Sequence, residues 1–433
     1  MSSEGLSLAE RMSGSWKQNI GRRFDSNHAA VLLGAVAVAL GIMSTLALAR
    51  LLGTEDFGRY AIFVAAVRLL VLPSEAGLPQ LVTREMNRGD RAHVVAWSKQ
   101  ILVVASVVVT IIFLAVEQFF RSGITIQTWL IVAAVAMLGA LHLCRGILLG
   151  DRQTIAALSP DSVLRPATLV GLVLVAAGTV GLDSQTAEIA FVTAIAVALS
   201  FAAVLARRVQ QGSANSTPVQ IFDRTLLRKL VPLTLIKGVR LVNRRVEILV
   251  LGALALTSEV AIYNVALQLT GLILLAQTMV NSRLSPHVAE ASKHRPEQLP
   301  GLVAQAVRIS TAFAGAAFLG LLLLGRFALG LLGDGFSDAY SLLVVLGLAN
   351  VLSAALGPTT MLLNMSDHAE DSFRSGLVAA VANIALMFLL IPRFGAMGAA
   401  ISAASVTVLI QVQRRVLVHR RLGIRPDVIA ALR

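Results

Sequence analysis

Residues 29–49 read AAVLLGAVAVALGIMSTLALA, a stretch without a single charged side chain. A helix needs about 20 mainly apolar residues to cross the hydrocarbon core of a bilayer, so this stretch is long enough to span one. Similar apolar runs recur along the chain, for example at 101–116 and 309–324. The strands of a membrane barrel would instead alternate apolar and polar residues. We therefore predict an all-α polytopic membrane protein.

The composition supports this class. Hydrophobic residues make up 56% of the 433 residues and charged residues only 14%, with a mean hydropathy of +0.77. Lysine and arginine (37) outnumber aspartate and glutamate (24), which in a soluble protein would suggest nucleic acid binding. Here most basic residues lie in short connections between apolar runs, where they set membrane orientation, so we predict no nucleic acid partner. Cys144 is the only cysteine, which excludes a disulfide within the chain.

The apolar runs predict about twelve spans. We place them at 28–51, 60–82, 100–118, 128–149, 163–181, 187–206, 231–254, 261–283, 302–324, 340–363, 376–392 and 396–413. Most arginine and lysine lies in the even-numbered connections and at the two ends of the chain. Because positive charge is retained on the cytoplasmic side, we predict that both termini are cytoplasmic.

An internal repeat predicts two six-helix lobes. Shifting the chain by 203 residues lays Thr54 on Thr257 and Tyr60 on Tyr263, and lays the first three spans on spans seven to nine. Six spans in each half give a parallel repeat, with substrate expected between the halves. The predicted parts are an N-terminal arm at 1–27, an N-terminal lobe at 28–206, a linker at 207–230, a C-terminal lobe at 231–413 and a basic tail at 414–433. The arm is either a short interfacial helix or a tail.

Residues 235–254 read LIKGVRLVNRRVEILVLGAL and carry unusual charge for a span. A charge at the centre of a membrane helix costs about 2.5–3.5 kcal/mol even on a lenient scale. One alternative is that 235–245 lies on the membrane surface. The repeat instead lays Lys237, Arg240 and Arg244 over the middle of the first span. With Glu247, these three residues occupy a sector about 80° wide on a helix. We therefore predict a charged stripe that faces a water-filled interior.

Two readings of this stripe stay open. In the first, its charges pair with one another and with Arg68 and Glu75, which share one face of the second span. In the second, the excess of positive charge binds an anion, because an unpaired buried cation is expensive. A diphosphate suits both the arginine fork and the lysine point charge. We predict a diphosphate-binding set consisting of Lys237, Arg240, Arg244 and Arg68, with secondary candidates Arg165, Arg308 and Asn243.

Motifs of enzymatic chemistry do not occur in the sequence. There is no G-x-x-x-x-G-K-[ST] loop for ATP and no H-E-x-x-H pair, and the seven histidines are scattered. No large loop between the spans carries paired carboxylates. We therefore expect a transporter that is not an enzyme and has neither a cofactor nor a metal site.

Three segments resemble a known family. ARLLGTEDFGRYAIF (49–63), EAGLPQLVTRE (75–85) and IPRFGAMGAAISA (391–403) are similar to the bacterial polysaccharide exporters of the multidrug/oligosaccharidyl-lipid/polysaccharide (MOP) superfamily. The resemblance implies two six-helix lobes around a central cavity that opens alternately to each side of the cytoplasmic (inner) membrane. Its implied substrate is an undecaprenyl-diphosphate-linked oligosaccharide, delivered to polysaccharide polymerase and export machinery.

Three questions remain at this stage. Glu75 and Glu247 are candidates for ion coupling, because a charged carboxylate inside the membrane is costly unless it has a function. A drug or cation antiporter of the same superfamily would need a cavity dominated by acidic residues, for which Glu75, Asp56 and Glu247 are the candidates. A non-transporting scaffold for polysaccharide synthesis would have no interior cavity.

Overall fold

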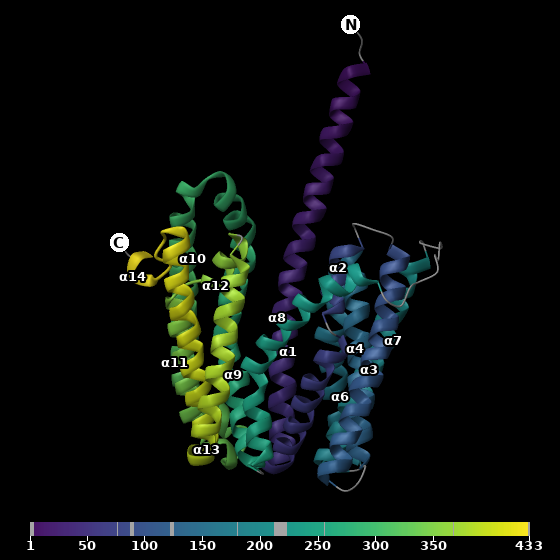
Figure 1. The fold of residues 1–433 in the computed structure, drawn as a ribbon, viewed down its shortest axis with the longest axis vertical. Helices are drawn as coiled ribbons and strands as arrows, with labels where there is room; N and C mark the ends of the chain where they lie inside the picture. Colours follow the sequence, from purple (N-terminus) through teal and green to yellow (C-terminus); the bar gives the residue numbers. More distant parts are fainter. Residues whose placement is uncertain are drawn as a thin grey trace.

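The computed structural model describes residues 4–75, 77–86, 91–121, 125–179, 181–211, 223–254, 256–366 and 368–431. Side chains are described for most of these, but not for 4–32, 240–245 and some single positions. The described part of the chain is helical and contains no strand (Figure 1). The N-terminal half consists of α1 (Glu4–Glu75), α2 (Leu78–Glu85), α3 (Arg91–Arg121), α4 (Ile126–Gly150), α5 (Thr154–Ser159), η1 (Pro160–Leu164), α6 (Arg165–Thr179) and α7 (Ser184–Gln211).

The C-terminal half forms a second helical bundle beside the first. Its elements are α8 (Arg224–Ala253), α9 (Thr257–His294), η2 (Pro296–Gln298), α10 (Leu299–Gly330), η3 (Asp334–Phe336), α11 (Ala339–Ala355), α12 (Thr359–Met365), α13 (Ala369–Leu422) and α14 (Val428–Ala431). Figure 1 shows both chain ends at the same end of the molecule, which agrees with an even number of crossings. α8 runs obliquely from the N-terminal bundle to the C-terminal one.

Two of the helices fold back on themselves at a glycine. Gly53 in α1 has φ 72° and Gly395 in α13 has φ 54°, values that glycine adopts without a steric penalty. Ala37 and Arg68 line one cavity, although a straight helix would separate them by about 46 Å. Ser402 Oγ likewise lies 3.0 Å from Asn383 Oδ1, nineteen residues away in α13. Each of these two helices is therefore a hairpin of two arms.

The number of spans depends on how these hairpins are counted. By length and apolar composition, eight helices of the described chain can cross a membrane, or nine if the bent pair α11 and α12 is one span. Twelve spans are therefore not confirmed. α1 and α13 each count once among the eight helices, although each is a hairpin, and the charged helix α8 is not among the eight. The sequence prediction of about twelve is compatible with the hairpins but remains a prediction.

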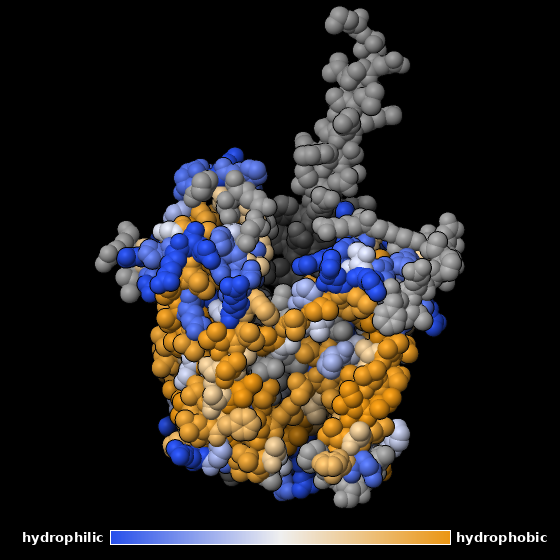
Figure 2. Space-filling model, in the orientation of Figure 1, coloured by the Kyte–Doolittle hydropathy of each residue, from blue (hydrophilic) through white to orange (hydrophobic). Residues whose placement is uncertain are grey.

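The largest apolar cluster joins the two halves at the end remote from the termini. The largest cluster of buried side chains combines Leu48, Phe57 and Phe63 of α1 with Ile248 of α8 and Tyr263 of α9. Towards the end that carries the termini lie two separate clusters: in one, the start of α8 (Leu226 and Leu230) packs on the N-terminal half, and the other belongs to the rest of the C-terminal half. Figure 2 shows an apolar belt between two polar caps, and a recess between the halves at that same end. The molecule is therefore open at the end with the termini and closed at the other.

The repeat explains how the closed end is built. The turn of α1 at Gly53 corresponds, after the shift of 203 residues, to the connection between α8 and α9. These two turns meet directly, because a Cβ on Gly58 would lie only 1.9 Å from the carbonyl oxygen of Thr257. Arg50 also donates a hydrogen bond to the carbonyl of Leu331 across the two halves. The closed end is therefore built in part from turns that correspond in the repeat.

Both terminal segments contain helix. α1 begins at Glu4 and is continuous with the first predicted span, so most of the arm predicted at 1–27 is helical. Within the basic tail predicted at 414–433, α13 extends to Leu422. α14 then packs against α10, and Asp427 pairs with Arg415 at 2.5 Å. The domain boundaries themselves remain predictions.

Candidate functional site

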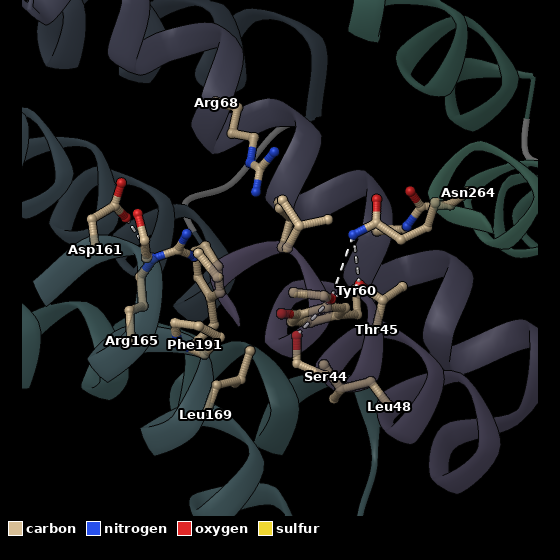
Figure 3. A pocket seen from close by; sticks show the side chains of 18 of the residues that line it. Ser44, Thr45, Leu48, Tyr60, Arg68, Asp161, Arg165, Leu169, Phe191 and Asn264 are labelled. Carbon is tan, nitrogen blue, oxygen red and sulfur yellow. Dashed lines mark hydrogen bonds and ion pairs between the residues drawn. The ribbon is translucent and has the colours of Figure 1, made fainter. Parts of the chain in front are cut away.

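A cavity of about 310 Å³ lies where the two arms of α1 meet η1, α6, α7 and α9 (Figure 3). Its charged lining residues are Arg68, Asp161 and Arg165. Uncharged polar groups and aromatic rings complete the wall, among them Ser44, Thr45, Tyr60, Phe191, Asn264 and Gln268. Two guanidinium groups and one carboxylate leave a net positive charge in the lining. Because α9 belongs to the second half, the cavity lies at the interface of the two halves.

The π-helical turn η1 positions two of these charges. Pro160 starts this turn and cannot donate the hydrogen bond that a regular helix would require of it. A π-turn accommodates such a break, and such turns are frequent at functional sites. Arg165 Nε donates to Asp161 Oδ1 at 2.9 Å, and the Arg165 guanidinium lies 5.8 Å from the centre of the Phe191 ring. Arg165 is therefore held at the cavity wall before any ligand binds.

A chain of charged side chains connects this wall to α8. Lys237 Nζ donates to one oxygen of Glu75 at 2.7 Å, and His142 Nδ1 lies 2.6 Å from the other oxygen. The second ring nitrogen of His142 is 3.8 Å from Asp161 Oδ2, and Arg145 Nη1 is 3.6 Å from the same oxygen. The chain crosses α8, α1, α4 and η1. The chain therefore links α8 to Asp161, a charged residue of the cavity lining.

The structure places Lys237 differently from the prediction. We expected an unpaired cation that waits for an anion, but Lys237 is paired with Glu75 and is absent from the cavity lining. Only 22% of the Lys237 side chain and 9% of the Glu75 side chain are exposed. Lys237 and Glu75 therefore form a pair of the kind described in the first reading, and binding of a diphosphate by Lys237 remains a prediction. A role of Glu75 in ion coupling remains a prediction.

Glu247 also departs from the predicted stripe. It is buried, and its Oε1 accepts a hydrogen bond from Asn383 Nδ2 at 2.9 Å. Asn383 lies on α13, whereas Lys237 contacts α1, so these two members of the stripe face different halves. The cause is the oblique path of α8, which brings one helical face against different neighbours at different levels (Figure 1). Glu247 does not line the cavity.

The remaining predicted residues divide into three groups. Arg68 and Arg165 line the cavity, and Figure 3 shows both with their guanidinium groups turned towards it. Arg308 lies on α10, is exposed, and does not line the cavity. The side chains of Arg240, Asn243 and Arg244 lie outside the described residues, so their assignment remains a prediction.

Sequence reasoning overlooked several residues of the site. Asp161 is not among the predicted site residues, although its spacing of four residues from Arg165 predicts a helical ion pair. His142 is not among them either, although an ionisable residue within a membrane span often indicates a functional site. Asn264 and Gln268 are one turn apart on α9, and Gln268 Nε2 donates to Thr45 Oγ1 at 3.2 Å. Nothing in the sequence indicated that α9 reaches the cavity.

This arrangement is suited to an anion with several oxygens. Guanidinium groups bind phosphate through paired N–H donors, and the amides and hydroxyls of the wall offer further donors. The aromatic rings and the small volume favour a compact polar group over a long chain. The cavity is accordingly a candidate site for the head group of an anionic lipid.

Solved transporter structures share this fold. An inward-facing multidrug transporter of the MATE family, in the MOP superfamily, superimposes with a TM-score of 0.71 at 17% identity, over 89% of this chain and 94% of the other. The lipid II flippase MurJ, in an inward closed conformation, gives 0.69 at 13% identity, over 90% of this chain and 87% of the other. At these identities the likeness shows the fold alone. It confirms the predicted all-α architecture.

Sequence comparison identifies the family. A probable low-salt glycan biosynthesis flippase of Haloferax volcanii, Agl15, is 22% identical over 384 residues, which is 87% of this chain and 78% of the relative. The model of the polysaccharide biosynthesis protein family matches residues 27–291, more than half of the chain. This match includes most of α1, α2 to α8 and most of α9, and therefore all the residues that line the cavity. The chain belongs to the polysaccharide biosynthesis protein family.

Proposed function

We propose that this protein is a flippase that moves lipid-linked oligosaccharides across the membrane by alternating access. More specifically, its substrate is an undecaprenyl-diphosphate-linked repeat unit, used for exopolysaccharide or O-antigen synthesis and passed on to polymerase and export machinery. The observation that carries this proposal is the cavity, in which Arg68 and Arg165 outnumber Asp161. Family membership and the flippase Agl15 support the same reading.

In this proposal the two arginines hold the diphosphate, and the polar wall holds the adjoining sugar. The open end faces the cytoplasm, as the distribution of basic residues predicts, so the head group enters from the inner leaflet. The polyprenyl chain stays in the bilayer. An inside-negative membrane potential favours outward movement of the diphosphate by about 2.3 kcal/mol per charge for every 100 mV.

The alternatives fit the geometry less well. A scaffold without transport would need no cavity between its halves. An exporter of cationic drugs would favour acidic lining residues, but Glu75, Asp56 and Glu247 are all absent from the lining. The fold shared with a multidrug transporter does not distinguish these functions, because one fold serves several substrates.

Export measured in cells that lack the native gene tests this proposal. We expect Arg165→Ala to weaken binding of undecaprenyl diphosphate about tenfold to a hundredfold, the effect of losing one charge-assisted hydrogen bond. Arg165→Lys should keep part of the activity, because the charge remains while the paired donors are lost. Arg59→Ala is the matched control, since Arg59 forms an exposed pair with Glu55 away from the cavity. Full export with Arg68→Ala and Arg165→Ala combined would refute the proposal.

A further inference from the structure

One buried carboxylate in the N-terminal half takes no part in the cavity lining or in the charge chain. Glu188 lies one turn into α7, and only 3% of its surface is exposed. Its Oε1 accepts a hydrogen bond from Gln127 Nε2 on α4, at 2.8 Å. Among the described residues, no lysine, arginine or histidine forms an ion pair with Glu188. Its partner is therefore a neutral amide.

This environment disfavours the ionised form of Glu188. A buried charge without a counter-charge is far more costly than a buried neutral group. Glu75 provides the contrast, because Lys237 donates to one of its oxygens and His142 contacts the other. Protonation makes Glu188 neutral while its carbonyl oxygen still accepts the bond from Gln127. Ionisable residues held in this way inside membrane helices commonly bind or transfer protons.

The charged neighbour of Glu188 also disfavours its ionised form. Asp183, just before the start of α7, adds a second negative charge on the side of the closed end. On the side of α1, Tyr60 lies within electrostatic reach of Glu188, Arg68 and Arg165. On the side of α6, Arg165 is directed to the ring of Phe191, one turn further along α7, and pairs with Asp161.

The position of Glu188 suits a group that exchanges protons between the closed end and the cavity. It lies about 6 Å along the helix axis from the first residue of α7, and Gln127 is the second residue of α4. Phe191, one turn after Glu188 on α7, and Tyr60, within electrostatic reach of Glu188, both line the cavity. Their rings meet edge to face with centroids 6.1 Å apart. A proton on Glu188 is thus close to the wall of the proposed substrate cavity.

We propose that Glu188 is a proton-binding site, loaded from the closed end and emptied when the protein changes conformation. Proton binding follows from the burial and partners of Glu188 alone. Its role in transport rests on the proposed flippase function. The two parts are therefore tested by separate measurements.

Infrared difference spectroscopy tests proton binding without any substrate. Purified protein titrated with acid should show the C=O stretch of a buried protonated carboxyl group, and Glu188→Gln should lack this band. The glutamine oxygen can still accept the bond from Gln127, so the variant should fold, and Glu188→Asp serves as a second variant. Glu55→Gln is the matched control, because Glu55 is exposed and paired with Arg59. Identical carboxyl bands in the wild type and Glu188→Gln would overturn the proposal.

Vesicles with an imposed pH gradient test the role in transport. The probe is undecaprenyl diphosphate, whose movement between leaflets is followed in reconstituted protein. We expect the pH gradient to change the rate for the wild type and for Glu55→Gln, but not for Glu188→Gln, which should still bind the probe. A response that persists in Glu188→Gln would refute coupling through this residue. If no protein moves the probe, the flippase function fails, while the infrared result stands independently.

Discussion

At the scale of single residues, two basic side chains show how the partner of a charged group determines where that group lies and what it can bind. Arg165 is held by Asp161 and Phe191 at the wall of a cavity, where its remaining donors are positioned for a ligand. Lys237 instead pairs with Glu75 and does not line the cavity. Both residues looked alike in the sequence, as basic side chains within apolar runs. Their contacts place one at the cavity wall, where we propose that it binds the ligand, and the other in a pair that connects two helices.

Lys237 should therefore matter for stability. We expect Lys237→Met to lower the free energy of unfolding by about 3 kcal/mol, because it removes the lysine that pairs with the buried Glu75. Adding Glu75→Gln should restore most of this loss, since the stranded charge is then removed. Thermal unfolding in detergent measures both variants. Lys229→Met is the matched control: its pair with Glu85, also 2.7 Å, is more exposed and should contribute at most about 1 kcal/mol. Unchanged stability of Lys237→Met with lost export would indicate a ligand role instead.

At the scale of elements, glycines and irregular turns decide where helices bend. Gly53 and Gly395 turn α1 and α13 into hairpins, and η1 orients Asp161 and Arg165. α14 is a further case, because four residues form a stable element only when tertiary contacts hold them. The carboxylate of Asp427 provides such a contact, since it accepts bonds from Arg415 and from the backbone N–H of Ala430.

The attachment of α14 should depend on pH. Burial alone would raise the pKa of Asp427, but the N–H of Ala430 and the Arg415 guanidinium hold this pKa below its usual value. A folded-state pKa below the unfolded value of about 3.9 stabilises the segment at neutral pH. This stabilisation is lost as the pH falls through the folded-state pKa. The protection factors of the amides around Ala431, that is, their exchange rates relative to an unfolded chain at the same pH, should accordingly fall under acid conditions, and Asp427→Asn should show low protection already at pH 7. Slow exchange in Asp427→Asn would mean that apolar packing on α10 alone holds α14.

At the scale of the whole molecule, the two halves form a V that is joined at the end remote from the termini (Figures 1 and 2). The joint contains large apolar side chains and close backbone contacts between the repeat-related turns. Alternating access requires this joint to open while the other end closes. The contacts at the joint are therefore the outer gate of the proposed transport cycle.

A reversible cross-link across this joint should arrest transport. A Cβ built on Gly335 lies 3.8 Å from Thr54 Cβ, which matches the separation of the two Cβ atoms in a disulfide. In a Cys144→Ser background, we expect Thr54→Cys with Gly335→Cys to oxidise readily and to abolish export, and a reductant should restore it. Each single cysteine variant serves as a control. Export that continues with the cross-link fully formed would show that this end does not open.

The sequence by itself determined the membrane class, the helical architecture and the two-fold repeat. These properties depend on local composition and spacing, because every backbone group in a bilayer must be satisfied within its own helix. The repeat even aligned the two turns, near Gly53 and Leu256, that meet at the closed end. It also selected Arg68 and Arg165, because a charge inside an apolar run is conspicuous wherever the chain folds.

Only the tertiary structure decided which charges meet. The chain from Lys237 through Glu75 and His142 to Asp161 joins residues up to 162 positions apart, and it depends on the angle at which α8 crosses the bundle. Glu188 shows the same limit, since its burial against Gln127 follows from the packing of α7 on α4. Helical periodicity places a residue on a face but does not say which neighbour that face meets. Which buried charges pair depends on that neighbour. The candidate site could therefore be identified only from the packed helices.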